Sequence, residues 1–343
     1  MNRMDKDKIV VITQMDDAHA DDVISTLQHT GHDPIRLNTD DLPMNATMSL
    51  SLERNNLSWE GSIEILTNGR AIDADAVRSI WWRRPAGFGL PTDLSEQERE
   101  FASDEIDAAL RGLWASLDCY WISHPENIRQ ASWKVEQLQR AARLGFGIPR
   151  TLITTDPEQA RAFYDSCDGQ MIFKVLTDPF LGAPKMVQKH PDQSPPEPYH
   201  IGTTLITDSE LDLLDAVRLT PCIFQEYVPK QLELRVTIIG DEIFGAAIHS
   251  QADERTSIDW RNYDADIPYH VAHLPTEVAE RCLAFVRSYG LNFSSMDLIL
   301  TPEEQYVFIE NNPNGQFIFV EHRVPELGMT EALASCLKRG TSS

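Results

Sequence analysis

Two stretches decide the fold of this chain: MDLI (residues 296–299) and FIENNPNG (residues 308–315). Their apolar runs predict neighbouring strands of one hairpin. Glu310 and Asn312 are two residues apart, so an extended backbone points both side chains to one face, and Asp297 on the other strand can point there too. Carboxylate and amide oxygens suit Mg²⁺. The hairpin therefore predicts a magnesium site, although Asn, Pro and Gly also cluster in ordinary turns.

The first third of the chain predicts an α/β domain. A strand (9–13), a helix (18–30) that ends at Gly31 and a strand (34–38) form a βαβ opening, which favours a parallel sheet. Next we expect a hairpin of two strands at 47–52 and 57–65, and a strand at 77–82. A long helix is expected after Pro91 and runs to about residue 117.

The rest of the chain mixes strands and helices. The patterns predict strands at 148–154, 171–176, 185–189, 200–207, 222–227, 233–239 and 242–249, and helices from about residue 131 to Gly145, at 208–217 and at 276–289. The fold class is therefore α/β followed by α+β. We expect three domains, an N-terminal one (residues 1–122), a central one (123–221) and a C-terminal one (222–343).

Composition narrows the range of partners. The 343 residues include 53 acidic and 30 basic side chains, and the net charge of −23 disfavours nucleic acid and anionic membranes. The five scattered cysteines have no C-x-x-C spacing and indicate neither a disulfide framework nor a zinc site. No stretch predicts a signal peptide or a membrane span, so a cytoplasmic location is expected.

The motif Asp…Glu-x-Asn-Pro-Asn-Gly at Asp297 and residues 310–315 resembles the magnesium motif of ATP-grasp enzymes. The resemblance implies the ATP-grasp fold, with ATP and Mg²⁺ as cofactors and Asp297, Glu310 and Asn312 as metal ligands. Lys134 and Lys174 are similar in position to two lysines that contact nucleotide phosphates in that family. Lys174 lies within an apolar run, where an unpaired ammonium is costly, so it is expected to meet an anion.

Other nucleotide contacts follow from the same resemblance. The segment Gln225, Glu226, Tyr227 and Val228 is similar to the family's hinge, where the Glu226 carbonyl and the Val228 amide would contact adenine. Glu233 matches the acidic position that binds the ribose hydroxyls. Arg235 matches the position that contacts the γ-phosphate or the acyl phosphate, which with Lys174 makes it a predicted catalytic residue. The i, i+2 spacing of Glu233 and Arg235 puts both on one face of a strand.

A narrower resemblance covers almost the whole chain. WWRRP (81–85), SQ (250–251), DWR (259–261) and NPNGQ (312–316) resemble ATP-grasp ribosomal peptide maturases, the microviridin-type macrocyclases. Those enzymes phosphorylate an Asp or Glu side chain of a precursor peptide and join it to a Thr or Ser hydroxyl or to a Lys amine. The resemblance also implies a homodimer. Arg83 and Arg84 are assigned to domain packing as readily as to substrate, and are left out of catalysis.

Substrate contacts are expected in two places. Arg255 and Arg261 follow the strands where the core of the peptide would lie, and a guanidinium suits its carboxylate, although surface ion pairs are the alternative. The resemblance places the leader peptide on a hairpin and helix that carry Asp192, Glu197, Asp212 and Asp215. A basic leader would complement these acids, but solvated surface is the ordinary role of any one of them.

Three alternatives stay open for the activity. The bond formed could be an ester, which we favour because no side chain is evident as a dedicated base for a lysine nucleophile, or an amide. A ligase acting on a small molecule or a protein terminus is the first rival, and a non-catalytic nucleotide-binding protein is the second. The pair His270 and His273 has the spacing of helical metal ligands, but prolines bracket it, and we interpret it as structural.

Overall fold

The computed structural model describes residues 6–54, 58–177, 180–181, 199–261 and 265–341. Its N-terminal sheet is parallel, in the order β2-β1-β6-β7. The elements are β1 (Lys8–Thr13), α1 (Ala18–His29), β2 (Ile35–Asn38), β6 (Val77–Trp82) and β7 (Tyr120–Ile122). Asp17 caps α1, since its carboxylate accepts from the His19 amide at 3.1 Å. The predicted βαβ opening is confirmed.

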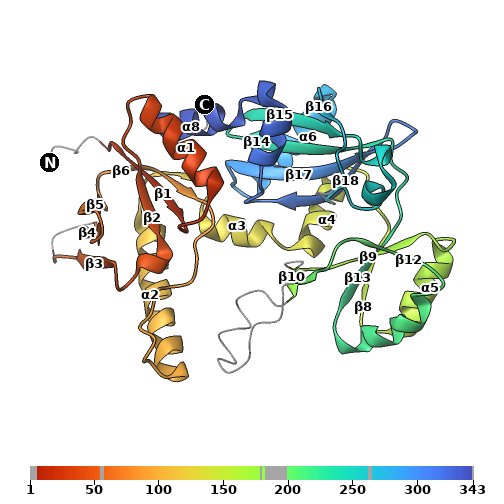
Figure 1. Ribbon diagram of the computed structural model, residues 1–343, viewed down its shortest axis with the longest axis horizontal. Coiled ribbons are helices and arrows are strands. Elements are labelled where there is room, and N and C mark those ends of the chain that lie inside the picture. Colours follow the sequence, from red (N-terminus) through yellow and green to blue (C-terminus); the bar gives the residue numbers. More distant parts are fainter. Residues whose placement is uncertain (1–5, 55–57, 178–179, 182–198, 262–264, 342–343) are drawn as a thin grey trace.

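A second small sheet and a long helix flank this domain. The antiparallel sheet contains β3 (Ala46–Ser51), β4 (Glu60–Ile65) and β5 (Arg70–Asp73), so the predicted hairpin is confirmed and gains a third strand. Helix α2 (Glu96–Ser116) begins with a capping box of Ser95 and Glu98. Its buried residues all lie near its C-terminal end, and the other end extends away from the sheet (Figure 1).

The central sheet is antiparallel, in the order β12-β9-β13-β8. Its strands and covering helices are β8 (Thr151–Thr154), α5 (Pro157–Ser166), β9 (Met171–Lys174), β12 (Thr204–Ile206), η3 (Leu211–Leu219) and β13 (Cys222–Glu226). The helix predicted at 208–217 is a 3₁₀ helix that begins later. A two-stranded pair, β10 (Phe180–Leu181) with β11 (Tyr199–His200), follows β9, and the strand predicted at 185–189 lies outside the described residues.

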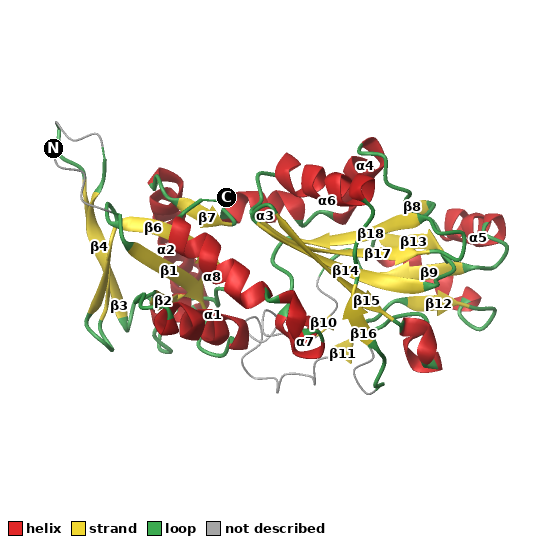
Figure 2. Cartoon of the chain, turned by 90° about the horizontal axis from the view of Figure 1, so that it is seen from above, coloured by secondary structure: helices red, strands yellow, loops and turns green. Residues whose placement is uncertain are grey.

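The C-terminal sheet carries the hairpin with which the sequence analysis began. Its order is β16-β15-β14-β17-β18, all antiparallel. The strands are β14 (Leu232–Ile239), β15 (Glu242–Ile248), β16 (Tyr269–Val271), β17 (Phe293–Leu300) and β18 (Tyr306–Asn312). The helices that share one core with its strands are α3 (Pro125–Ala131), α4 (Lys134–Arg143) and α6 (Thr276–Ser288) (Figure 2). Residues 125–143 therefore pack on this sheet, and domain boundaries at residues 122 and 221 stay a prediction.

The last helix returns to the first sheet. Helix α7 (Ile318–Arg323) leads to α8 (Met329–Arg339), and α8 packs against α1 and β6. Ser79 Oγ donates to the Leu337 carbonyl at 2.8 Å, and Leu333 and Leu337 are fully buried against β1 and α1. Among the described residues, the other short 3₁₀ helices are η1 (Thr39–Asp41), η4 (Ser250–Ala252), η5 (Glu254–Thr256) and η6 (Pro325–Leu327).

Three further expectations concerned membrane spans, the cysteines and the pair His270 and His273. In the part of the chain that the structure describes, no helix combines the length and the apolar character needed to cross a bilayer. All five cysteines carry free thiols. His270 lies on strand β16 and not on a helix, so the helical metal spacing considered for His270 and His273 does not apply.

Candidate active site

The three predicted metal ligands meet on the β17–β18 hairpin. Asp297 pairs in register with Glu310, and a bulge follows Asp297, so its side chain, that of Glu310 and that of Asn312 share a face. The Asn312 amide nitrogen lies 3.4 Å from both Asp297 Oδ2 and Glu310 Oε1. Amide oxygen and nitrogen are interchanged by a flip, which would present a third oxygen to a cation. Three oxygen-bearing side chains thus surround one point, as a small divalent ion requires.

Three basic side chains neutralise these carboxylates. Arg261 Nη2 lies 3.0 Å from Asp297 Oδ2 and 2.6 Å from Glu310 Oε1. Arg235 Nη1 donates to Asp297 Oδ1 at 2.8 Å, and Lys134 Nζ lies 3.3 Å from Glu310 Oε2. Buried carboxylates need such partners, because an unpaired charge in the interior is strongly destabilising. Arg261 therefore touches the same two oxygens that a metal ion would coordinate.

The pKa values of the two carboxyls are shifted in opposite directions by their neighbours. Burial alone would raise the pKa of Glu310, but Arg261, Lys134 and Lys174 hold it well below its usual value. Burial raises the pKa of Asp297 against the pull of Arg235 and Arg261, and the Glu310 charge adds to that rise. Two carboxylates that share one point repel each other, so a divalent cation between them would stabilise both anions.

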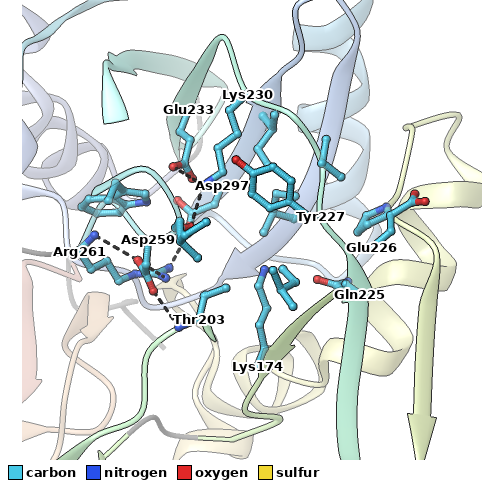
Figure 3. A pocket seen from close by; sticks show the side chains of 17 residues that line it. Lys174, Thr203, Gln225, Glu226, Tyr227, Lys230, Glu233, Asp259, Arg261 and Asp297 are labelled. Atoms are coloured by element: carbon cyan, nitrogen blue, oxygen red, sulfur yellow. Dashed lines mark hydrogen bonds and ion pairs between the residues drawn. The ribbon is translucent and has the colours of Figure 1, made fainter. Parts of the chain in front are cut away.

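A cleft opens beside the hairpin, between the central and C-terminal sheets (Figure 3). Lys174, the last residue of β9, points into it and has no hydrogen-bond or ion-pair partner among the described residues. Burial lowers the pKa of Lys174 to about 8, and Arg261 and Lys134 add to this effect while Glu310 opposes it. A buried ammonium of this kind is stabilised by an anion, such as one that a ligand supplies.

The predicted hinge forms one wall of this cleft. Strand β13 ends at Glu226, whose carboxylate accepts from the Arg150 amide at 2.8 Å, and the Tyr227 amide donates to the Gln170 carbonyl at 2.8 Å. The Val228 amide has no backbone partner in the described parts of the chain, so it is available to a ligand. The Gln225 side chain donates to Thr151 Oγ1 and is thereby held on the neighbouring strand β8.

Glu233 lies on the opposite wall, where the sequence analysis missed its partner. Lys230 Nζ is 2.9 Å from Glu233 Oε1 and also donates to the Ile258 carbonyl at 2.8 Å. Burial raises the pKa of Glu233, and Lys230 opposes the rise. The i, i+3 spacing of Lys230 and Glu233, next to the hinge, was the signal that could have identified Lys230.

Asp259 is a further residue of the cleft to which the sequence analysis gave no role. Its Oδ2 accepts from the Thr203 amide and its Oδ1 from the Arg261 amide, both at 3.1 Å. Burial would raise the pKa of Asp259, but Arg261, these two amides and Lys174 lower it, so the side chain is an anion. Thr203 comes from the central domain, and this contact therefore joins the two walls of the cleft.

The other predicted substrate residues lie elsewhere. Arg255 pairs with Asp253 at 2.6 Å and does not line the cleft. Asp212 and Asp215 are exposed on η3, where Asp215 pairs with Arg161 at 3.1 Å. Asp192 and Glu197 lie outside the described residues. Of the predicted substrate residues that the structure describes, Arg261 is thus the one placed in the cleft.

The turn after Asn312 has room for no side chain at Gly315. A Cβ there would lie 2.6 Å from Ser295 Cβ and 2.9 Å from Arg235 Nη2. The Gly315 amide donates to the Asn312 carbonyl at 3.0 Å, which closes the turn. Arg235 also donates to the Gln316 carbonyl at 3.0 Å. The absence of a side chain at Gly315 therefore allows Arg235 to contact both the β17–β18 hairpin and the turn after Asn312.

The local charge differs from that of the whole chain. Around the hairpin and cleft, the described side chains include five bases and five acids: Lys134, Lys174, Lys230, Arg235 and Arg261 against Glu226, Glu233, Asp259, Asp297 and Glu310. A chain of net charge −23 thus gathers as many basic as acidic side chains at this point. A locally balanced charge accommodates a polyphosphate better than the rest of the surface, which would repel it.

The sequence and the fold of this chain are similar to those of known proteins. Residues 8–129 match the family model of the MvdD pre-ATP grasp domain. The macrocyclase MdnC from Microcystis aeruginosa MRC, whose crystal structure contains the precursor peptide MdnA, is 29% identical, with a TM-score of 0.82 over 97% of this chain and 99% of its own. The chain has the fold of the ATP-grasp ligases and is similar to the ribosomal peptide maturases among them. No curated protein matches it by sequence.

Two more solved structures support the assignment to the ATP-grasp ligases. A RiPP-associated ATP-grasp ligase from Chryseobacterium gregarium, in complex with ADP and with a leader and core peptide, is 26% identical, with a TM-score of 0.84 over 97% of this chain and 96% of its own. The macrocyclase MdnB from Microcystis aeruginosa MRC is 29% identical, with a TM-score of 0.76 over 96% of this chain and 98% of its own. The predicted ATP-grasp fold and the ligase class are thereby confirmed.

Proposed function

We propose that this ligase is a macrocyclase that phosphorylates Asp or Glu side chains of a ribosomal precursor peptide and joins them to Thr or Ser hydroxyls as ω-esters. The cofactors are ATP and Mg²⁺. One observation carries the proposal: the Lys174 ammonium, which has no hydrogen-bond or ion-pair partner among the described residues, lies in a cleft beside three convergent oxygen-bearing side chains. The ADP and peptides in similar ligases supply the substrate class.

The cleft explains how the nucleotide would be held. The free Val228 amide lies where it can meet the adenine edge, and Glu233 on the facing wall can accept from the ribose hydroxyls. Lys134, Lys174 and Arg235 are placed to contact the phosphates. Mg²⁺ held by Asp297, Glu310 and Asn312 would neutralise charge on the transferring phosphoryl group. The residues of this chain therefore position the reactants and screen their charge.

The chemistry proceeds in two balanced steps. A peptide carboxylate oxygen attacks the γ-phosphorus, and the bond to the ADP oxygen breaks, which gives an acyl phosphate and ADP. The peptide hydroxyl then attacks the acyl carbon, phosphate leaves, and the hydroxyl proton is released. Holding both groups on one bound peptide gives an effective molarity of roughly 10⁵ M or more, and a closed cleft excludes the water that would hydrolyse the acyl phosphate.

Arg261 is the side chain that we assign to the substrate carboxylate. It is half-buried between Asp297 and Glu310, and its Nη1 also lies 3.6 Å from Asp259. With a cation held by Asp297 and Glu310, this guanidinium would no longer be needed to neutralise them and could donate to a carboxylate of the peptide. A Lys amine as the acceptor, which gives an ω-amide, is the alternative with the same first step.

The remaining features of the proposal concern partners. A leader peptide would bind the central domain near η3, with its basic residues opposite Asp212 and Asp215. Homodimer formation and a cytoplasmic location stay predictions. The free thiols of all five cysteines are compatible with a reducing compartment.

The decisive experiment uses the purified chain, ATP, Mg²⁺ and a synthetic peptide encoded by a short reading frame beside the gene. A macrocyclase must release ADP and remove one water mass per ring from the peptide, as seen by mass spectrometry. Alkaline hydrolysis then distinguishes esters, which reopen, from amides, which persist. ADP release that depends on free amino acids, with the peptide mass unchanged, would favour a small-molecule ligase instead.

A further inference from the structure

Arg83 lies at the seam between the N-terminal domain and the metal hairpin. It directly follows β6, is 1% exposed, and reaches the turn after Asn312. Its Nη1 donates to the Asn314 carbonyl at 2.8 Å and lies 3.3 Å from the Gly315 carbonyl. The Asn314 side-chain amide donates in return to the Arg83 carbonyl. The two residues therefore hold each other through four polar groups.

The far side of the guanidinium is fixed to helix α1. Arg83 Nε lies 3.5 Å from Asp17 Oδ2, and Asp17 is itself 6% exposed. Asp17 Oδ2 accepts from Thr13 Oγ1 at 2.7 Å, while Asp17 Oδ1 caps the helix through the His19 amide. A carboxylate with this many partners cannot move without loss of the helix cap. The Arg83 side chain is thus anchored on rigid elements.

The turn that Arg83 holds is the one that begins at a metal ligand. The Gly315 amide donates to the Asn312 carbonyl, so the positions of Asn314 and Gly315 determine that of Asn312. Arg235, which also binds Asp297, takes the next carbonyl, that of Gln316. Two arginines from different domains therefore fix three successive carbonyls, and one of them also contacts a metal carboxylate.

We propose that Arg83 is a positioning residue for metal binding, which holds the turn after Asn312 so that the side chains of Asn312, Asp297 and Glu310 converge. The inference rests on the proposed function, because it presumes that these three side chains bind Mg²⁺. Partners beyond the direct ligands typically change metal affinity by about 10–100-fold when they are removed. A lysine at position 83 would keep the charge near Asp17 but lose the planar guanidinium that places the Nη1 donor against the turn.

Strand β6 provides a matched control. Arg78, near its other end, also joins the N-terminal domain to the C-terminal part of the chain, since its Nη1 donates to the Lys338 carbonyl at 3.0 Å and its Nε to the Lys6 carbonyl at 2.8 Å. It contacts α8 and not the metal hairpin. Arg78→Lys therefore loosens the same pair of domains without touching the turn.

The test is the affinity for AMPPNP, measured by calorimetry with Mg²⁺ and again with EDTA, for wild type, Arg83→Lys, Asn314→Ala and Arg78→Lys. In wild type, Mg²⁺ should increase the affinity for AMPPNP. We expect this increase to be about tenfold smaller in Arg83→Lys, whose affinity for AMPPNP in EDTA should equal that of wild type. Asn314→Ala should show a smaller loss, because Arg83 can still reach the backbone carbonyls. Arg78→Lys should keep the full effect of Mg²⁺.

Two results would overturn the inference: an Mg²⁺ effect in Arg83→Lys equal to that of wild type, or an equal loss of affinity with Mg²⁺ and with EDTA. Asn314→Ala gives an independent measurement should Arg83→Lys unfold. Failure of the proposed function looks different, because wild type itself would then show no Mg²⁺-dependent binding of AMPPNP.

Discussion

Adding one methyl group at Gly315 tests whether the turn and Arg235 are packed as described. In Gly315→Ala, the new carbon would lie 2.6 Å from Ser295 Cβ and 2.9 Å from Arg235 Nη2. Carbon atoms attract at about 3.5–4.0 Å, so the turn must move by about 1 Å. Ser295 is fully buried and cannot give way easily. The turn, and with it Arg235, is therefore expected to shift away from Asp297.

The magnitudes follow from overpacking and from misplacement of Arg235. Overpacking of a tight interior costs about 1–3 kcal/mol, which a urea unfolding curve of Gly315→Ala would show. A displacement of about 1 Å at a catalytic group can cost about 100-fold in rate. We expect ADP formation in the presence of the precursor peptide to fall by that factor, with a smaller change in stability.

Gly112→Ala is the matched control, because a Cβ at this position in α2 meets no atom within 4 Å. There the same substitution should stabilise the helix by about 0.5–1 kcal/mol and leave ADP formation unchanged. Ser295→Gly combined with Gly315→Ala removes the nearest clash and should recover part of the lost activity. The packing argument fails if Gly315→Ala is as stable and as active as Gly112→Ala.

Three further predictions concern single side chains of the site. The KM for ATP should rise as pH passes above about 8, because the Lys174 ammonium, whose pKa is lowered to about 8, loses its proton. In Lys174→Arg, whose guanidinium stays charged, the KM for ATP should not change over this pH range. Asn312→Ala should raise the Mg²⁺ concentration needed for half-maximal ADP formation by about tenfold or more, and an unchanged Mg²⁺ titration would remove Asn312 from the metal site. Glu233→Gln keeps the shape of the side chain but loses a charged hydrogen-bond acceptor worth about 1.5–3 kcal/mol, so its Kd for ATP should rise by about 10–100-fold. If wild type bound ATP and 2′,3′-dideoxy-ATP with equal affinity, the proposed contact between Glu233 and the ribose would be contradicted.

The shared face of Asp297, Glu310 and Asn312 on the β17–β18 hairpin could be predicted because it depends on sequence patterns that are local. Two apolar strands and the i, i+2 spacing of Glu310 and Asn312 determine one face, and the structure places Asp297 opposite Glu310 in register. Hydrophobic periodicity likewise predicted the βαβ opening. Each of these features depends on residues close together in the chain or on strands joined by one turn.

Contacts between distant segments could not be predicted in the same way. The amide of Thr203 meets Asp259, 56 positions along the chain, and Arg83 meets Asn314 across 231 positions. No periodicity relates such residues, since docking of one domain on another brings them together. Arg261 shows the same limit, because its contacts with the carboxylates of Asp297 and Glu310 were not expected from the sequence, while its role toward a substrate carboxylate stays a prediction.

The return of α8 to the N-terminal sheet affects how the chain can fold during synthesis. Ile9 and Val11 on β1 belong to the same buried core as Leu333 and Leu337, whereas Val10 and Ile12 face the side covered by α2. A nascent chain can therefore cover the α2 side of its first sheet early, and α1 covers part of the other side, but that side stays incomplete until residues 329–339 have left the ribosome. The apolar surface left exposed there would promote chaperone binding or aggregation during most of translation. Stop codons shortly before residue 329 should consequently yield insoluble protein, even though they leave every residue assigned to the cleft intact.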